Sequence, residues 1–377
     1  MLVGHMHFID LHKQRSRIED EINSAIARVL EHGQYILGPE VRAFEASLAD
    51  YGQAQHVLSC ANGTDAIILA LKAWNIGPGD AVFCPSFTYV ATAEAVALLG
   101  ATPVFIDVDR ELYTACPVSL KHAIDDVKDK GELTPRAFIA VDLFGQCADY
   151  RKLAPICRDA GLKLIADSAQ GFGSLLDERH PLHWADVTTT SFFPAKPLGC
   201  YGDGGAILTN DASLADIIDS LRVHGKGDDK YDNVRIGLNS RLDTLQATIL
   251  IEKLKIFDDE LQARQSIASR YNKAFEGSAI RAPKVIEGGT STWAVYTVEV
   301  PERDDFVAAM SAQKIPTPAY YPKPAHLQSA YKHFPLAPKG LPLTEQAMNH
   351  VVALPIHPYL SEAEQDLIIA TAIKAVS

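Results

Sequence analysis

The chain has 377 residues, of which 47% are apolar and 22% charged, and its formal net charge is −12 at pH 7. A length beyond that of most single hydrophobic cores predicts two packed domains, and the lack of a long apolar run argues against membrane insertion. The acidic balance argues against binding to nucleic acid or anionic membranes, because both partners require a basic surface.

The cysteines predict a reducing compartment. They are scattered along the chain without a CxxC pair or a histidine cluster at zinc spacing, so we predict no metal site and a cytoplasmic location. Residues 1–5 look like an added remnant ahead of a natural start at Met6, and they are left out of the fold prediction. The six cysteines are Cys60, Cys84, Cys116, Cys147, Cys157 and Cys200.

Short apolar runs alternate with helical stretches from about residue 57 to residue 208. This alternation predicts the α/β class, with a mostly parallel seven-stranded sheet between two layers of helices. Ligands of such sheets bind at the carboxyl ends of the strands. The expected strands are 55–60, 81–84, 102–107, 137–143, 163–166, 187–193 and 204–209, and the helices between them are 64–74, 90–99, 118–127 and 150–160.

The remaining third of the chain predicts a second, smaller domain. After a helix at 211–224, residues 239–243 open a long helix that runs to about residue 275, with Ser240 as its N-cap. We therefore expect a large domain at 6–250, a small α+β domain at 251–377 and a linking helix at about 241–275. The small domain contains segments 292–300 and 306–313, a proline-rich link at 315–324 and a final helix at 362–376.

A lysine lies between an apolar run and a glycine-rich turn, in Ser191-Phe-Phe-Pro-Ala-Lys196-Pro-Leu-Gly. Most lysines are solvated surface charges, but these neighbours exclude water, and the glycines permit a tight backbone path. Desolvation lowers the pKa of a lysine, so that its neutral amine can condense with an aldehyde. Lys196 is therefore predicted to hold pyridoxal phosphate as a Schiff base.

An aspartate at a strand end complements this lysine. Asp167 follows the apolar run 164–166, where it either caps the next helical segment or faces a ligand. Opposite a pyridine nitrogen, its carboxylate would favour the protonated ring, which withdraws electrons strongly. The pair of Lys196 and Asp167 indicates a pyridoxal-phosphate enzyme.

A phosphate cradle is predicted where the first strand meets its helix. The N–H groups of Gly63 and Thr64 lie at a helix start, and Ser191 can donate to the same phosphate. A glycine–threonine pair alone is more often an ordinary turn. Of two aromatic residues that follow the next strand, Tyr89 is the candidate to stack on the cofactor ring, whereas Phe87 is assigned to the core.

Several of these motifs, taken in order, resemble the DegT/DnrJ/EryC1/StrS family of nucleotide-sugar aminotransferases, which have the pyridoxal-phosphate fold type I. The resemblance runs from about Phe8 to Leu360 and rests on six separate motifs, so a chance match is improbable. The motifs are Gly38-Pro-Glu40, Asn62-Gly-Thr-Asp-Ala66, Pro85-Ser-Phe-Thr-Tyr89, Asp167-Ser-Ala-Gln170, Ser191-Phe-Phe-Pro-Ala-Lys196 and Asn239-Ser-Arg-Leu-Asp243.

The resemblance implies a role for each matching position. Lys196 would bind the cofactor covalently, Asp167 would pair with the ring nitrogen, and Gln170 would bond the ring hydroxyl. The phosphate would be held by Ser191, Gly63 and Thr64. The family is dimeric, so Asn239 is expected to complete the phosphate site of the neighbouring subunit. Arg241 is expected to reach the substrate across that interface. Asn239 has an alternative interpretation as an ordinary residue at a helix start.

Two departures from the family pattern concern the cofactor turn and the sugar. Ser168 stands where the family usually has alanine, and Tyr320-Tyr-Pro322 stands where close relatives often carry His-Tyr-Pro. Members that replace the lysine by histidine are sugar dehydratases, and Lys196 argues against that branch.

The segments 32–39, 143–149 and 196–201 look most like the subgroup that aminates UDP-2-acetamido-2-deoxy-3-oxo-glucuronate for surface polysaccharides such as O-antigen. Glutamate is the expected amino donor. The carboxylate of such a sugar suits a forked guanidinium such as that of Arg241. A 4-keto-6-deoxy nucleotide sugar is the alternative. The other residues expected to contact the sugar are Tyr35, Tyr320, Tyr321 and His326.

Two readings from other classes are weaker. A noncatalytic member that senses cofactor or sugar is disfavoured by the intact set of Lys196, Asp167 and Gln170. A dinucleotide-dependent dehydrogenase ranks last, because no GxGxxG motif follows the first expected strand.

Overall fold

A seven-stranded sheet forms the centre of the fold in the computed structural model, which describes residues 6–229 and 231–377. The expected remnant 1–5 lies outside the described residues. The strands are β1 (His56–Cys60), β2 (Asp80–Pro85), β3 (Thr102–Ile106), β4 (Thr134–Val141), β5 (Lys163–Asp167), β6 (Val187–Ser191) and β7 (Gly205–Thr209).

The order of the strands brings their carboxyl ends to one edge of the sheet. They are arranged β1-β7-β6-β5-β4-β2-β3, and only β7 is antiparallel to its neighbours. The register pairs Gly205, at the start of β7, with both Cys60 and Ser191, at the ends of β1 and β6. The expected mostly parallel sheet is confirmed, and its ligand-binding edge contains these strand ends.

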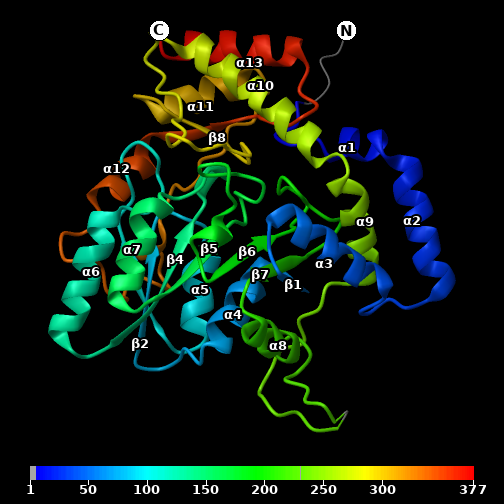
Figure 1. The fold of residues 1–377 in the computed structure, drawn as a ribbon. Coiled ribbons are helices and arrows are strands. Elements are labelled where there is room, and N and C mark those ends of the chain that lie inside the picture. Colours follow the sequence, from blue (N-terminus) through cyan, green and yellow to red (C-terminus); the bar gives the residue numbers. More distant parts are fainter. Residues whose placement is uncertain (1–5, 230) are drawn as a thin grey trace.

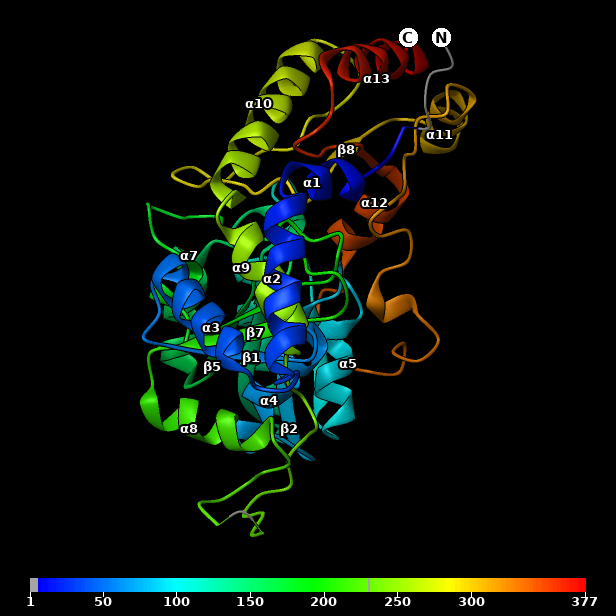
Figure 2. The ribbon, with the colours of Figure 1, turned by 90° about the vertical axis from the view of Figure 1, so that its right-hand side faces the viewer.

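Helices cover both faces of this sheet, and for that reason its strands are apolar almost throughout. Figure 2 shows α3 and α7 on one side and α5 on the other. The helices associated with the sheet are α3 (Pro39–Gly52), α4 (Gly63–Ala73), α5 (Ala91–Leu98), α6 (Pro117–Lys130), α7 (Tyr150–Ala160) and α8 (Ala212–Leu221). Short 3₁₀ turns occur at η1 (Leu143–Gly145) and η2 (Pro181–His183).

The expected long linking helix is two helices, α9 (Thr244–Leu254) and α10 (Phe257–Phe275), which are interrupted at Lys255 and Ile256. The prediction of Ser240 as an N-cap is wrong. The Ser240 hydroxyl instead accepts a hydrogen bond from the Ala61 N–H at 3.2 Å, and α9 begins after Asp243. Two N-terminal helices, α1 (Leu11–Arg17) and α2 (Glu19–His32), precede α3, and α2 packs along α9 (Figure 2).

The C-terminal part has a two-stranded antiparallel sheet of β8 (Tyr296–Glu299) and β9 (Val351–Leu354). Figure 1 shows α10, α11 (Arg303–Ala312) and α13 (Glu362–Ala375) together above the large sheet. Along the chain between α11 and α13 come η3 (Ala325–Leu327) and α12 (Pro342–His350). The segment that joins η3 to α12 returns to the large sheet, where the backbones of Pro335 and Ala337 form hydrogen bonds with that of Phe105. None of the helices in residues 6–229 and 231–377 has the length and apolar character that a membrane crossing requires.

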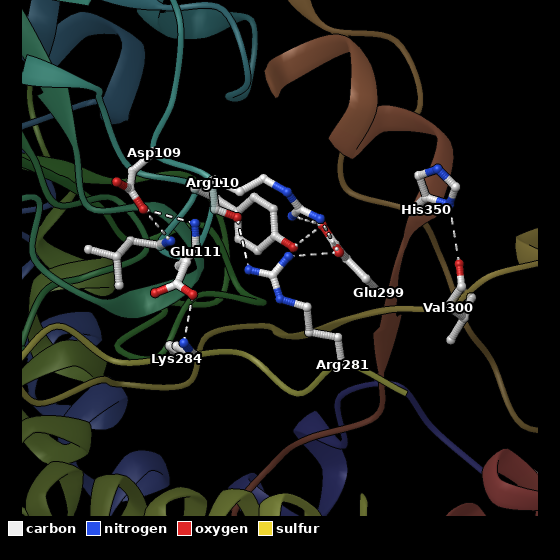
Figure 3. Close-up of polar contacts among 10 residues, drawn as sticks. Asp109, Arg110, Glu111, Arg281, Lys284, Glu299, Val300 and His350 are labelled. Atoms are coloured by element: carbon white, nitrogen blue, oxygen red, sulfur yellow. Dashed lines mark hydrogen bonds and ion pairs between the residues drawn. The ribbon is translucent and has the colours of Figure 1, made fainter. Parts of the chain in front are cut away.

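A charged cluster around Glu299 joins the two parts of the molecule (Figure 3). Its carboxylate accepts two hydrogen bonds from Arg110, at 2.5 and 3.0 Å, one from Arg281 at 2.9 Å and one from the Tyr113 hydroxyl at 2.6 Å. Burial alone would raise the pKa of Glu299. The bonds from Arg110 and Tyr113 and the charge of Arg281 outweigh burial, so the pKa lies below its ordinary value.

Replacing Glu299 with glutamine is expected to lower the free energy of unfolding by about 2 kcal/mol at pH 7, because two arginines lose a charged acceptor. A lowered carboxylate pKa stabilises the fold above its unfolded value of about 4.3, and this stabilisation disappears as pH falls through the folded value. Urea unfolding at pH 7 and at acidic pH should therefore show the difference from the parent protein shrinking with acid. The exposed Glu276 gives the control variant Glu276→Gln, and equal losses for the two variants would contradict this role for the cluster.

Candidate active site

Asp167 is the last residue of β5, a strand in the interior of the sheet, and its side chain faces the ligand-binding edge almost fully buried. Its carboxylate accepts hydrogen bonds from the Thr92 hydroxyl and from the Ala169 N–H, both at 3.2 Å. Burial raises the pKa of Asp167, although these two hydrogen bonds and the charge of Lys196 act to lower it. The carboxylate is thus held in a fixed direction and has capacity for a cationic partner.

Lys196 lies in a closed turn between β6 and β7. The Lys196 N–H donates to the Phe193 carbonyl at 2.8 Å, and the Cys200 N–H donates to the Phe192 carbonyl at 2.8 Å. Gly199 has no room for a side chain, because a Cβ atom there would lie 2.5 Å from the Pro194 carbonyl oxygen. The glycine therefore serves the tight backbone path that the sequence predicts.

A second lysine, which belongs to α9 and not to the turn itself, also anchors the turn. The ammonium of Lys253, a fully buried residue of α9, donates to the Gly199 carbonyl at 2.6 Å and lies 4.3 Å from the centre of the Tyr201 ring. Burial lowers the pKa of Lys253 to about 8. The buried Lys253 side chain therefore holds the segment that carries Lys196 in place.

Lys196 and Asp167 act on each other through their charges. Burial lowers the pKa of the Lys196 amine, and the negative charge of Asp167 partly opposes that shift. Within the described chain no ion pair of 4.0 Å or less joins the two groups. An amine of lowered pKa thus lies near a carboxylate without a direct ion pair, which is the arrangement that a Schiff-base lysine and a ring-pairing aspartate require.

The predicted phosphate cradle is assembled by close approach of glycines. A Cβ atom on Gly63 would lie 2.7 Å from the Ser191 Cβ, and one on Gly205 would lie 2.4 Å from the Asn62 carbonyl oxygen. Asn62 caps α4 by accepting from the Asp65 N–H at 2.8 Å. The first N–H groups of a helix have no acceptor within the helix, because no helical turn precedes them. The N–H groups of Gly63 and Thr64 are therefore donors for a ligand beside the Ser191 hydroxyl.

Gln170 lies beside Tyr321. Its amide oxygen accepts from the Phe144 N–H at 2.7 Å, and its amide nitrogen donates to the Tyr321 hydroxyl at 3.0 Å. Burial raises the pKa of Tyr321, and the charge of Asp167 adds to the rise against the bond from Gln170. Tyr89 is 60% exposed. The assignment of Phe87 to the core is confirmed, because its side chain is fully buried.

Three predicted residues, Tyr35, Asn239 and Arg241, belong to two segments whose backbones meet at Asp243 and Thr244. The Tyr35 carbonyl accepts from the Thr244 N–H at 2.9 Å, which places Tyr35 beside the segment that carries Asn239 and Arg241. Asn239 is exposed and Arg241 half-buried. We call this surface, with residues 35–37 and 239–241, the 35/239 face.

His326 does not lie where a substrate contact was expected. Its ring Nδ1 lies 2.6 Å from the Ser86 hydroxyl, and its backbone N–H donates to the same hydroxyl at 3.0 Å. Its ring Nε2 lies 3.4 Å from the Glu345 carboxylate. With only 5% of its surface exposed, it ties η3 to the end of β2. Tyr320, by contrast, is half-buried and packs beside Tyr321 and Phe8.

Three site residues escaped the sequence analysis because their partners lie far away along the chain. They are Thr92, which bonds Asp167, Lys253, which anchors the lysine turn, and Asp142, which lies beneath Asp167. A signal existed for Asp142, because it is the one charged residue of the apolar run 137–143, which was expected to be a buried strand. Another existed for Lys253, which interrupts the apolar face of α9.

The sequence matches the model of the DegT/DnrJ/EryC1/StrS aminotransferase family over residues 16–373. A UDP-2-acetamido-2-deoxy-3-oxo-D-glucuronate aminotransferase of Pseudomonas aeruginosa is 45% identical over 97% of this chain and 99% of that protein. A DegT DnrJ EryC1 StrS aminotransferase structure from Brucella abortus has a TM-score of 0.97 and 51% identity, over 99% of this chain and 100% of that one. The structure of ntda from Bacillus subtilis with bound cofactor PMP has a TM-score of 0.88 and 28% identity, over 100% and 86%.

Proposed function

Because the chain belongs to the DegT/DnrJ/EryC1/StrS aminotransferase family, we propose that it moves an amino group from glutamate to the keto group of a nucleotide-linked sugar. The observation that carries this proposal is the pair of Lys196, with its lowered pKa, and the buried Asp167 at one sheet edge. The full-length similarity to a 3-oxo-glucuronate aminotransferase supports UDP-2-acetamido-2-deoxy-3-oxo-glucuronate as the acceptor.

Pyridoxal 5′-phosphate is the cofactor, and the residues present fit it. The cradle of Gly63, Thr64 and Ser191 offers hydrogen-bond donors to a phosphate, and close glycine contacts keep side chains out of it. Asp167 suits the ring nitrogen, and Gln170 and Tyr89 lie on segments beside the same edge. When bound, the cofactor supplies an aldehyde that carries the amino group and a ring that withdraws electrons.

The side chains of this chain handle the proton. A lysine amine with a lowered pKa is neutral often enough to accept a proton at Nζ from the α-carbon of the amino donor and to return it later. Phe192 and Leu198 beside Lys196 are buried and exclude water from the amine. The Asp167 carboxylate would balance a positive ring nitrogen. General acid–base catalysis of this kind contributes about 10²–10⁴ in rate.

Purified protein tests the activity directly. With pyridoxal phosphate it should be yellow, lose that absorbance irreversibly on borohydride reduction, and convert to the pyridoxamine form with glutamate. Single-turnover reactions of that form with 3-keto and 4-keto sugar nucleotides should then favour the 3-keto uronate. Preference for a 4-keto-6-deoxy sugar would overturn the proposed acceptor, and no spectral response to any amino donor would overturn the enzyme.

We also propose a homodimer in which the 35/239 face of one subunit completes the site of the other. Three apolar residues of this face, Tyr35, Ile36 and Leu37, are 47%, 49% and 37% exposed. Their backbone pairs with Asp243 and Thr244, shortly after Asn239 and Arg241 in the chain. The side chains of Asn239 and Arg241 have polar groups suited to phosphate and carboxylate. A second copy would bury the apolar surface and bring these two polar groups to its cofactor site.

Mixed dimers test this arrangement. Lys196→Ala and Arg241→Ala proteins are each expected to be inactive, but unfolding and refolding them together should restore about one quarter of the activity, because half of the dimers then contain one intact site. If Arg241 served its own subunit, every site would carry one defect, and no activity would return. Refolding each variant alone is the control.

The wider setting follows from the same proposal. We propose a cytoplasmic role in making sugars for surface polysaccharides, supported by six cysteines that are all free thiols. We also propose the domain division 6–250 and 251–377. In support, the apolar residues around Tyr271, Tyr296 and Ile368 form a core distinct from those of the large sheet.

A further inference from the structure

Beneath Asp167 lies a second carboxylate, that of Asp142, which the proposed reaction does not use. It directly follows β4 and is completely buried. One oxygen accepts from the Tyr150 hydroxyl at 2.7 Å and from the Ala148 N–H at 2.9 Å, and the other accepts from the Ser168 hydroxyl at 2.5 Å. A buried charge in such a setting is costly unless all its donors are present.

The contacts of Asp142 surround the Asp167–Gln170 turn. Its backbone N–H donates to the Asp167 carbonyl at 3.0 Å, and its side chain holds Ser168, the next residue. A Cβ atom on Gly171 would lie 2.4 Å from the Asp142 Cβ, so the residue after Gln170 rests directly on Asp142. The Asp142 side chain thus contacts the residue that follows Asp167 and the residue that follows Gln170, the two residues expected to face the cofactor ring.

The charge of Asp142 is coupled to that of Asp167. Burial raises the pKa of Asp142 to about 7, against the bonds from Ser168, Tyr150 and Ala148, and repulsion by Asp167 adds to the rise. Rearranging the Asp142 contacts therefore affects both the position and the charge environment of Asp167.

We propose that Asp142 and Ser168 form a positioning pair that holds the Asp167–Gln170 turn in register with the cofactor ring. The inference rests on the proposed function. The structure gives the Ser168 hydroxyl a purpose as a donor that the buried Asp142 carboxylate requires. Neither residue touches the reacting atoms, and both act through Asp167 and Gln170.

A double-mutant cycle tests the pair with Ser168→Ala, Asp142→Asn and the double variant. Each single variant is expected to weaken pyridoxal-phosphate binding about tenfold and to change the visible circular dichroism of the bound cofactor, which reports ring orientation. The double variant should bind no more weakly than the weaker single variant, because both changes break one network. Multiplicative losses, or unchanged dichroism in both single variants, would overturn the proposal.

Ser174→Ala is the matched control, because it removes another fully buried hydroxyl nearby. This hydroxyl bonds the Gly171 carbonyl at 2.7 Å and, in the part of the chain that the structure describes, makes no hydrogen bond with Asp142. It should lower thermal stability but leave the dichroism unchanged. If Asp142→Asn fails to fold, the comparison of Ser168→Ala with Ser174→Ala decides alone. A parent protein that ignores pyridoxal phosphate and glutamate would refute the proposed function, whereas a responsive parent with an unaffected Ser168→Ala variant would refute only the positioning pair.

Discussion

Replacing Lys196 with alanine is expected to reduce the rate of amino transfer by about 10⁴-fold or more, at the upper end of what a lost acid–base group costs. The variant loses both the amine that binds the cofactor and the group that moves the proton. Lys196→Arg should fail equally, because a guanidinium stays protonated near neutral pH. Single-turnover absorbance with glutamate measures the rate, and dialysis should remove a cofactor that is no longer covalently held.

The exposed Lys339 supplies the control variant Lys339→Ala, which should turn over normally and keep its cofactor through dialysis. Because Lys196 lies in a partly exposed turn, its truncation should leave the thermal unfolding temperature nearly unchanged, so that the loss is one of chemistry. Normal turnover by either Lys196 variant would exclude this lysine as the reacting group.

The second large effect is expected for Asp167→Asn, which should lower kcat by about 10²–10³, the range measured when one preorganised electrostatic group is removed. The amide keeps the shape of the carboxylate, and its oxygen still accepts from the Ala169 N–H while its NH2 donates to the Thr92 hydroxyl oxygen. It removes the charge that favours a protonated ring. The absorbance of the bound cofactor should then titrate at a different pH.

The Asp167→Asn change should also act on Lys196, with a definite sign. Since Asp167 raises the pKa of the Lys196 amine, its neutralisation should lower that pKa further. The rate at which the cofactor-free protein reacts with an amine-selective reagent, followed against pH, should shift to lower pH. Asp50→Asn, at an exposed carboxylate, should shift neither titration, and an unchanged Lys196 profile in Asp167→Asn would show that the two charges do not interact.

The sequence was sufficient for features that depend on neighbouring residues. Alternating apolar runs predicted the sheet, and strand ends predicted the positions of Asp167 and Ser191. Contacts between distant residues could not be read in this way. The Ser240 hydroxyl looked like a helix cap, but it bonds Ala61, and His326 looked available to a sugar, but Ser86 holds it inside.

The same reason explains why three residues of the site were not predicted. Thr92, Asp142 and Lys253 act through partners that folding brings close, and nothing in their local sequence names those partners. The roles of Asn239 and Arg241 depend on a second copy of the chain, so they stay predictions for which the mixed dimers are the test.

The two lysines of lowered pKa have a practical consequence. Lys196 is partly exposed, whereas Lys253 is buried and hydrogen-bonded to Gly199. At a pH where ordinary lysines remain charged, an amine-selective label should therefore react first at Lys196 of the cofactor-free protein. The amount of label bound early in such a reaction would count the competent sites in a preparation, and specific activity could be expressed per working site instead of per milligram of protein.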